Sequence, residues 1–319
     1  MDAIAACWQS LENGLLAHLI VPLLALTGLA GAVQNPRDIA QFLMINLIQI
    51  SVIALLFRPL ESLVPAEQWA DRKLTRVDIV YTVLKGLGLV PLFSFVMLAP
   101  LGHWLGDFGG LIDTGDTSRI AQWFPWFSTH PILLFAVYFV LLDFVAYWVH
   151  RLQHKLPFWW AMHSLHHSQR QLSCWSNDRS HILDDGIEAV ITALTSLMIG
   201  VPPGQYAALI LAGTLVENFS HANVALRFGR VLDKLLVDPR FHRTHHILAP
   251  PDQPHLHDCN YALVLPVWDI LFGTARYNLV AEKTGVTDPG IDADNTKFWL
   301  GQQIAGFRRL RRALGVLAG

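Results

Sequence analysis

A chain of 319 residues with 53% hydrophobic and only 15% charged residues is poorer in charge than soluble domains, in which about a quarter of residues are charged, and this deficit indicates a bilayer protein. The net charge of −2 argues against nucleic acid as a partner. Three cysteines without a Cys-x-x-Cys pair exclude a zinc ribbon, a thioredoxin-type redox motif and an iron–sulfur site.

Four apolar segments are long enough to be predicted as membrane-spanning helices. They cover residues 14–33, 42–57, 79–101 and 131–149. The second is short unless Pro59 and Leu60 extend it. A fifth apolar stretch, 189–216, is interrupted by Gly200-Val-Pro202-Pro203-Gly204, which predicts a hairpin or re-entrant segment rather than one straight span. We therefore expect an all-α integral membrane protein with about four transmembrane helices plus this segment.

Basic residues set the expected orientation in the membrane. The loop 58–78 carries four of them, whereas the loop 102–130 has only Arg119 beside three aspartates. The positive-inside tendency places the first loop in the cytoplasm and the second outside, so the chain returns to the cytoplasm near residue 150. Four arginines within 308–312 agree with that side, as a solvated helix end or as a contact with anionic headgroups. The chain beyond the fourth span is then expected to form a cytoplasmic, histidine-rich helical cap.

Eight of the fifteen histidines fall into three runs beyond the fourth span. These are His150 and His154; His163, His166 and His167; and His242, His245 and His246. On a helix, positions i, i+3 and i+4 lie on neighbouring ridges, so each run can aim its rings at one point. One such run is often no more than a group of polar core residues, but a repeated His-x-x-His-His indicates a metal site with more than one ion. The spacing alone leaves the metal open, zinc included.

Further residues are candidates for the same site. His221 comes after the broken apolar stretch and is a candidate ligand. Asp143, Tyr147 and Asn223 are expected to support the ligands, with Asp143 accepting a proton from a ring N–H or pairing with an arginine. No carboxylate lies inside the runs, and Glu-x-x-His and His-Glu-x-x-His motifs are absent, unlike soluble di-iron bundles and zinc proteases. Gly-x-Ser-x-Gly, P-loop and Gly-x-Gly-x-x-Gly motifs are absent too.

The runs belong to a longer pattern over about 143–274. It reads Asp143-xxx-Tyr147-xx-His150-Arg151-xx-His154, His163-xx-His166-His167-Ser168, His242-xx-His245-His246, and Asn260-Tyr261 followed by Leu265-Pro266-x-Trp268-Asp269-xx-Phe272-Gly273-Thr274. This pattern closely resembles the fatty acid hydroxylase/sterol desaturase superfamily. Where that family often shows Arg-x-His-Pro-x-Glu, the chain has Arg179-Ser-His181-Ile-Leu-Asp184, which makes His181 a candidate extra ligand. His255 and His257 have no counterpart in the family pattern and are interpreted as surface or supporting residues.

The resemblance implies a membrane-bound non-haem di-iron oxygenase that binds two iron ions and uses O2 as co-substrate. It further implies a lipid substrate whose tail enters through a groove lined by apolar spans. Because the chain shows no electron-carrier motif, a separate ferredoxin-, flavoprotein- or cytochrome-type donor is expected as a partner. Hydroxylation of a fatty acyl, sterol or related lipid is favoured by analogy with the family, and desaturation at the same centre is the alternative.

A metal transporter is a more remote alternative, because transporters place ion sites near the bilayer midplane on interrupted helices in matched repeats, and no repeat is found here. The predicted organisation has three parts. Residues 1–130 hold N-terminal transmembrane helices and loops, 131–280 form the hydroxylase-like catalytic domain, and 281–319 form a basic cytoplasmic tail.

Overall fold

The computed structural model describes residues 2–28, 30–31, 35–88, 118–250, 252–253 and 255–317. These residues form helices and loops without a β-strand, apart from two isolated bridges, so the all-α prediction is confirmed for the described part of the chain. Within the described ranges, three helical segments are long and apolar enough to cross a membrane, namely Ala5–Thr27, Pro36–Leu63 and Pro131–Lys155. The predicted third span begins within α5 (Arg76–Gly86), and its part beyond residue 88 lies outside the described residues.

The first two spans differ from their predicted bounds. The first begins nine residues earlier than predicted and comprises most of α1 (Asp2–Leu15), a π-helical turn and α2 (Val21–Thr27). The second is one continuous path through α3 (Pro36–Val52), a π-helical turn Ile53–Phe57 and α4 (Arg58–Leu63). In that turn Arg58 N bonds to Ile53 O, and this wider turn lets the helix continue past Pro59, whose ring would clash with a regular preceding turn.

The fourth predicted span is helix α8 (Pro131–Lys155), which continues six residues beyond the predicted end and so carries His150 and His154 on helical backbone. After extended Leu156, Pro157 starts α9 (Pro157–His167), because proline fits the first helical turn. The break in the fifth apolar stretch falls where the sequence predicts it. Helix α10 (Ile182–Ile199) ends at Gly200 with φ +72°, and α11 (Pro203–His221) begins after Pro202.

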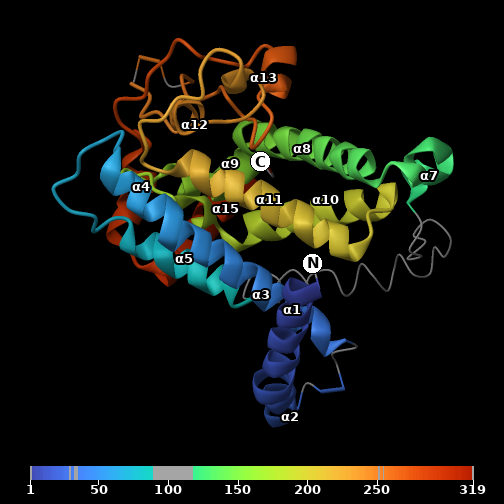
Figure 1. Ribbon diagram of the computed structural model, residues 1–319. Coiled ribbons are helices and arrows are strands. Elements are labelled where there is room, and N and C mark those ends of the chain that lie inside the picture. The colour runs from blue at the N-terminus through green and yellow to red at the C-terminus, as the bar shows by residue number, and fades with distance from the viewer. Residues whose placement is uncertain are drawn as a thin grey trace.

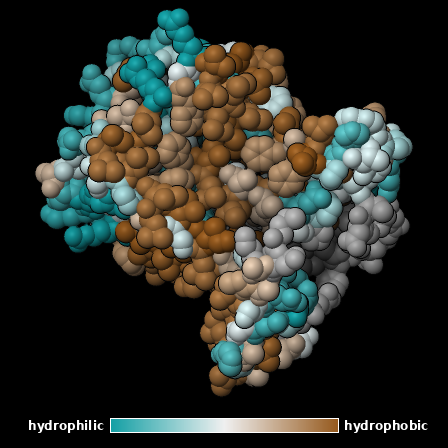
Figure 2. Space-filling view, viewed as in Figure 1, coloured by the Kyte–Doolittle hydropathy of each residue, from teal (hydrophilic) through white to brown (hydrophobic). Residues whose placement is uncertain are grey.

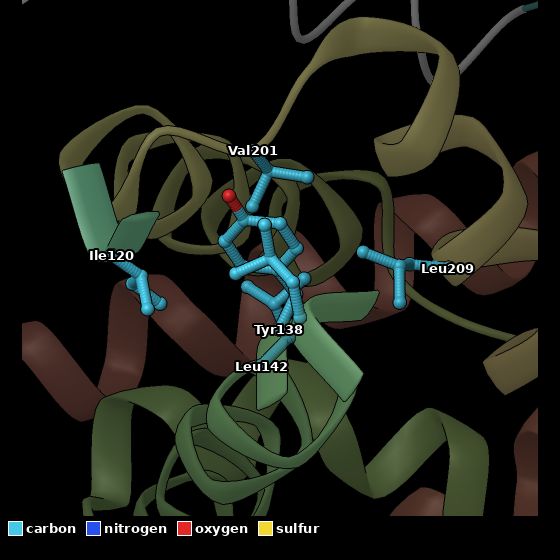
Figure 3. Close-up of a cluster of buried hydrophobic side chains, with 6 residues drawn as sticks. Ile120, Tyr138, Leu142, Val201 and Leu209 are labelled. Atoms are coloured by element: carbon cyan, nitrogen blue, oxygen red, sulfur yellow. The ribbon is translucent and has the colours of Figure 1, made fainter. Parts of the chain in front are cut away.

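The turn between α10 and α11 packs against the first half of α8. Figure 3 shows the buried side chains of Tyr138 and Leu142 from α8 meeting Val201 of the turn and Leu209 of α11, with Ile120 of α7 (Arg119–Trp123) beside them. The Tyr138 hydroxyl donates to Gly200 O at 3.0 Å and also contacts the Ser118 hydroxyl. The turn is therefore held by a part-buried hydrogen bond from Tyr138 beside an apolar cluster.

Replacing Tyr138 by phenylalanine should lower the stability of the protein. The change leaves the part-buried Gly200 carbonyl without its donor, and an intramolecular hydrogen bond contributes about 0.5–1.5 kcal/mol net to stability. We expect the melting temperature in detergent to fall by several degrees while the metal content per folded chain stays the same. An unchanged melting temperature would show that water replaces the hydroxyl at this turn.

Apolar surface covers much of one side of the molecule. Figure 2 shows it over α8, α10 and α11, where exposed side chains include Leu133, Val140, Met198 and Ile210. A contiguous exposed apolar face of this kind fits contact with lipid. Hydrophilic residues gather instead around the loop after α4 and the segments near α12 (Pro239–His245) (Figures 1 and 2).

The end of the second span is tied to the histidine-bearing segments. The Glu61 carboxylate accepts from Cys174 N at 2.8 Å and Asn223 N at 3.0 Å, and it pairs with Arg72 at 2.9 Å. Glu67 pairs with Arg243 of α12. The basic loop 58–78 and the histidines thus lie at the same end of the helices.

The C-terminal segment is packed onto the fold. Helix α15 (Trp299–Leu317) lies against α9, with Arg309 donating to Ala161 O at 3.0 Å and pairing with Asp294 at 2.7 Å. Short helices α13 (Val267–Leu271) and α14 (Pro289–Asp292), with 3₁₀ turns Pro125–Thr129, Ser176–Asp178, Leu232–Lys234 and Ala293–Thr296, complete the described elements.

Candidate metal centre

Nine buried histidines converge from four helices. Helix α8 contributes two and α9 three, α11 contributes its last residue, and α12 with its C-cap contributes three. In α12 the Asp238 carboxylate caps the helix by accepting from Phe241 N at 2.7 Å, and Pro239 occupies the first turn, so seven residues suffice to present this run. The three runs and His221, far apart in sequence, therefore meet in one place.

The histidines divide into two groups, and within each group the possible ligand nitrogens all lie within 4.8 Å of one another. The first group holds His150, His154, His163, His167 and His245. The second holds His166, His221, His242 and His246. Each adjacent pair is split, with His166 and His246 in the second group and their neighbours His167 and His245 in the first. Consecutive helical residues point about 100° apart, so the two rings of each adjacent pair can point into two neighbouring groups.

Outer hydrogen bonds orient five of the nine rings. The Nδ1 atoms of His150 and His245 donate to Tyr261 O and Cys259 O, each at 2.7 Å, and His221 Nδ1 donates to Glu217 O at 2.7 Å. His163 Nδ1 bonds to the Asp184 carboxylate at 2.9 Å, and His166 Nδ1 to Arg179 O at 3.2 Å. A ring that donates through Nδ1 carries its lone pair on Nε2, which then points into the centre.

Burial disfavours the charged form of six rings outside the membrane spans. Desolvation lowers the pKa of five α9 and α12 histidines well below the usual value, and it lowers the pKa of His221 to about 4. The residues lowered well below are His166, His167, His242, His245 and His246. Neutral imidazole is the form that binds metal. The lowered pKa values therefore favour metal binding over protonation at this centre.

The nitrogen contacts fit a shared ion. His221 Nε2 lies 3.1 Å from His166 Nε2 and 3.0 Å from His242 Nε2, and His246 Nε2 lies 3.2 Å from His242 Nε2. Each nitrogen has one in-plane direction, so His221 Nε2 cannot make both contacts as hydrogen bonds. Two nitrogens about 2.1 Å from one ion and at right angles would lie about 3.0 Å apart. In the first group, Nε2 of His150, His163, His167 and His245 has no hydrogen-bond partner among the described residues.

The segment 259–262, which supplies two of the carbonyl acceptors, is shaped by Asn260 and Asp269. Asn260 adopts φ +55° and its side chain donates to Phe241 O and accepts from Arg276 N. The Asp269 carboxylate accepts from Tyr261 N at 2.9 Å and from Ala262 N at 2.8 Å. The Asn-Tyr and Trp-Asp parts of the sequence pattern thus position carbonyls against the rings, and the Tyr261 ring itself packs against His150, His154 and His245.

Four candidate residues lie elsewhere. Asp143 accepts from Val264 N, Leu265 N and Trp268 Nε1, so it holds this loop, and its hydrogen-bond partners among the described residues include neither a histidine nor an arginine. Tyr147 bonds to Thr274 and Arg151, and Asn223 bonds to the backbone of Glu67. His181 caps α10 by accepting from Leu183 N, and its Nε2 lies 3.2 Å from Gln303 O. His181 therefore belongs to neither group.

Sequence reasoning did not identify Asp184 as the partner of His163. Besides His163 Nδ1, its carboxylate accepts from Gln153 Nε2 at 2.8 Å and from Trp159 Nε1 at 2.7 Å. The sequence held one signal for this role, because Asp184 stands where the family pattern Arg-x-His-Pro-x-Glu has its glutamate. His257 lies beside the first group, with its ring stacked on Trp160, whereas His255 is on the surface.

A cavity of about 60 Å³ opens beside the histidines, and a site for one water needs ~10–15 Å³ in this measure. His150 and His163 from the first group and His166, His221 and His242 from the second line it. Both groups are therefore accessible to one bound molecule. This cavity differs from the expected apolar groove, because among the described residues that line it only Ala146, Val149 and Leu263 are apolar.

Comparison with known proteins shows what the segment that carries this centre is similar to. Residues 135–274 match the fatty acid hydroxylase family. The chain is 27% identical to an ornithine lipid hydroxylase of Rhizobium tropici, over 93% of this chain and 85% of that protein. It is 31% identical to the alkylglycerol monooxygenase of Homo sapiens over 47% of this chain, but spans only 32% of that protein. A very-long-chain aldehyde decarbonylase of Oryza sativa is 27% identical over 48% of the chain and 25% of its own length.

No solved structure gives a significant match. The matched segment contains all nine converging histidines and the loop that orients two of them. The family match, which covers less than half of the chain, and the relatives agree with the resemblance seen in the histidine runs, so this segment of the chain is similar to the fatty acid hydroxylase family.

Proposed function

We propose that this protein is a membrane-bound lipid hydroxylase whose two histidine groups hold two iron ions. One observation carries the proposal: nine imidazoles gather in two neighbouring groups beside a common cavity, and Nε2 atoms of the first group have no hydrogen-bond partner among the described residues. Bound iron would supply the activation of O2 that inserting one oxygen atom into a C–H bond requires. The donor set, all nitrogen, also suits other divalent metals, so iron rests on the family.

The protein's own residues orient the histidine rings and enclose the proposed metal centre. His150, His163 and His245 are fixed by partners outside the centre, and tight packing excludes bulk water from it. Converting R–H and O2 into R–OH and water consumes two electrons and two protons. A separate ferredoxin-, flavoprotein- or cytochrome-type protein is proposed as the electron donor.

We also propose four spans with the centre facing the cytoplasm. The shared position of the basic loop 58–78 and the histidines at one end of the helices supports this orientation. A cysteine introduced at Arg312 should react with an impermeant maleimide only after the cytoplasmic side is exposed. Labelling from the outside of intact cells would reverse the orientation.

The function is tested by metal analysis and by product mass. We expect about two irons per chain in the purified protein, and a 16-unit gain in one class of membrane lipid in cells that produce it. Hydroxylation is preferred to desaturation because the relatives are named a hydroxylase and a monooxygenase. A 2-unit loss would identify a desaturase. Bound metal without any lipid change or O2 uptake, with reductant and lipid present, would refute the enzymatic proposal and favour a transporter.

The names of the relatives specify an ornithine lipid and an alkylglycerol, which differ in their polar parts. The comparisons therefore leave the class of lipid open.

A further inference from the structure

One side of helix α15 is an apolar ridge that the described part of the chain leaves exposed. The ridge consists of four residues that are between 42% and 58% exposed, namely Leu300, Ile304, Phe307 and Leu314. Their spacing of four, three and seven residues places them along one side of the helix. The opposite side is the one that packs, since Gln302 and Gly306 are buried there. A contiguous ridge of this kind, unlike a single exposed leucine, marks a contact surface.

Three arginines follow this ridge, and none of them has a partner within the described part of the chain. Arg308, Arg311 and Arg312 are exposed and make no hydrogen bond or ion pair there. Arg309, by contrast, points to the inner side and pairs with Asp294 at 2.7 Å. The helix itself contains no aspartate or glutamate. At about 100° per residue, the three unpaired guanidinium groups lie within and along the ridge, so positive charge without a counter-ion borders the apolar surface.

The contacts of α15 place it where the apolar helices end. Near its start, Gln302 accepts from the Tyr81 hydroxyl of α5 at 2.8 Å, and farther along Arg309 donates to the backbone of α9. Helix α9 begins two residues after α8 ends, and Gly306 packs on His181, the N-cap of α10. Helix α15 thus crosses from α5 to α9 at the level where α8 ends and α10 begins. Where α8 crosses a bilayer, this level is that of the lipid headgroups.

We propose that the outer side of α15 lies on the membrane surface and binds anionic lipid there. The apolar ridge enters the boundary between headgroups and acyl chains, and the arginines bind lipid phosphates. Arginine suits this position because its aliphatic stem covers apolar surface while the guanidinium reaches a phosphate. A second copy of the chain fits the ridge less well, because a two-fold interface brings the same arginines face to face. The inference concerns lipid around the protein and goes beyond the proposed hydroxylation of a substrate.

Binding of short-chain lipids to the full chain in detergent tests the charge of this surface. The probes are dioctanoylphosphatidylglycerol, which is anionic, and dioctanoylphosphatidylcholine, which is zwitterionic. We expect the anionic probe to bind at least about tenfold more tightly in calorimetry. Arg308→Gln combined with Arg311→Gln should reduce that preference to about threefold or less. Arg227→Gln combined with Arg230→Gln removes as much charge from the exposed loop after α11 and should keep the preference.

The depth of the ridge in a bilayer tests its apolar part. A nitroxide is attached to Ile304→Cys and, as the control, to Gln253→Cys in an exposed loop, in nanodiscs that contain phosphatidylglycerol. Cys7 is first replaced by serine, because the other two cysteines are buried. We expect electron paramagnetic resonance to show that O2 reaches the label at Ile304 better than a water-soluble nickel chelate does, and the reverse at Gln253.

Equal binding of the two lipids, no binding of either, or an equal loss of preference in both double variants overturns the proposal. Access of the nickel chelate to Ile304 like that at Gln253 also overturns it, since the ridge then faces water. Dipolar broadening at Ile304 would show a second copy on the ridge instead of lipid. Melting temperature and metal content show which variants are intact. Because neither measurement needs turnover, the outcome does not depend on hydroxylase activity.

Discussion

Replacing His221 by alanine should remove one of the two proposed irons and lower lipid turnover by more than ~100-fold. This loss is larger than the ~10- to 100-fold cost of removing a residue that only hydrogen-bonds to a metal ligand. The His221 Nε2 atom touches nitrogens of both His166 and His242, so it is central to the four-histidine group. Three nitrogens remain there, while the five-histidine group keeps all its members. Iron per chain, measured by mass spectrometry of the purified protein, should fall from about two to about one.

His255 supplies the matched control. Its side chain is 85% exposed, and it belongs to neither the five-histidine nor the four-histidine group. His255→Ala should therefore keep both irons and near-normal turnover. If His221→Ala retained two irons and full activity, the division of the histidines into groups of five and four would be wrong.

Much of the centre could be predicted because its information is local. Spacings of three and four residues place His163, His166 and His167 on adjoining ridges of α9 whatever the rest of the chain does. The adjacent pair His166-His167 even indicated two ions, because neighbouring residues cannot share a face. The helix break near Gly200 was equally local, since it follows from proline and glycine chemistry.

The partners of the rings could not be predicted, because they are long-range and are mostly backbone. The carbonyl that accepts from His150 belongs to Tyr261, 111 positions away, and every residue type has such a carbonyl. His181 shows the opposite error. Its sequence context suggested a ligand, but Gly306 of α15 packs so closely on its ring that even one added methyl group would collide. Only the folded chain shows that contact.

The polarity of the residues that line the cavity could not be predicted from the sequence either. Apolar helices suggested an apolar groove, yet Lys85, Glu188 and Glu217 come from three separate helices and meet at one wall. Hydropathy averages over a helix and hides single charged residues that face inward. The possible extension of the second span through Pro59 and Leu60 is confirmed, but the π-helical turn that carries the helix past Pro59 is not visible in hydropathy, which also missed the start of this span at Pro36.

Asp184→Asn should weaken iron binding and turnover by about 10- to 100-fold, the usual cost of losing an outer partner of a metal ligand. Asp184 accepts from three donors: His163 Nδ1, Gln153 Nε2 and Trp159 Nε1. An asparagine can still accept from the amide and the indole through its oxygen, but it then presents an NH₂ group to His163. The ring of His163 would change tautomer and point an N–H at the ion, which cannot bind metal.

This mechanism separates a positioning role from a merely structural one. Asp184→Asn is nearly isosteric, so the melting temperature of the metal-free protein should change little, while the iron concentration needed for half-maximal loading should rise. Asp184→Glu keeps an acceptor for His163 and should restore part of the loading. The exposed Asp252→Asn serves as the control and should leave iron affinity unchanged. Equal iron affinity in Asp184→Asn and the parent protein would mean that His163 does not depend on this carboxylate to present Nε2.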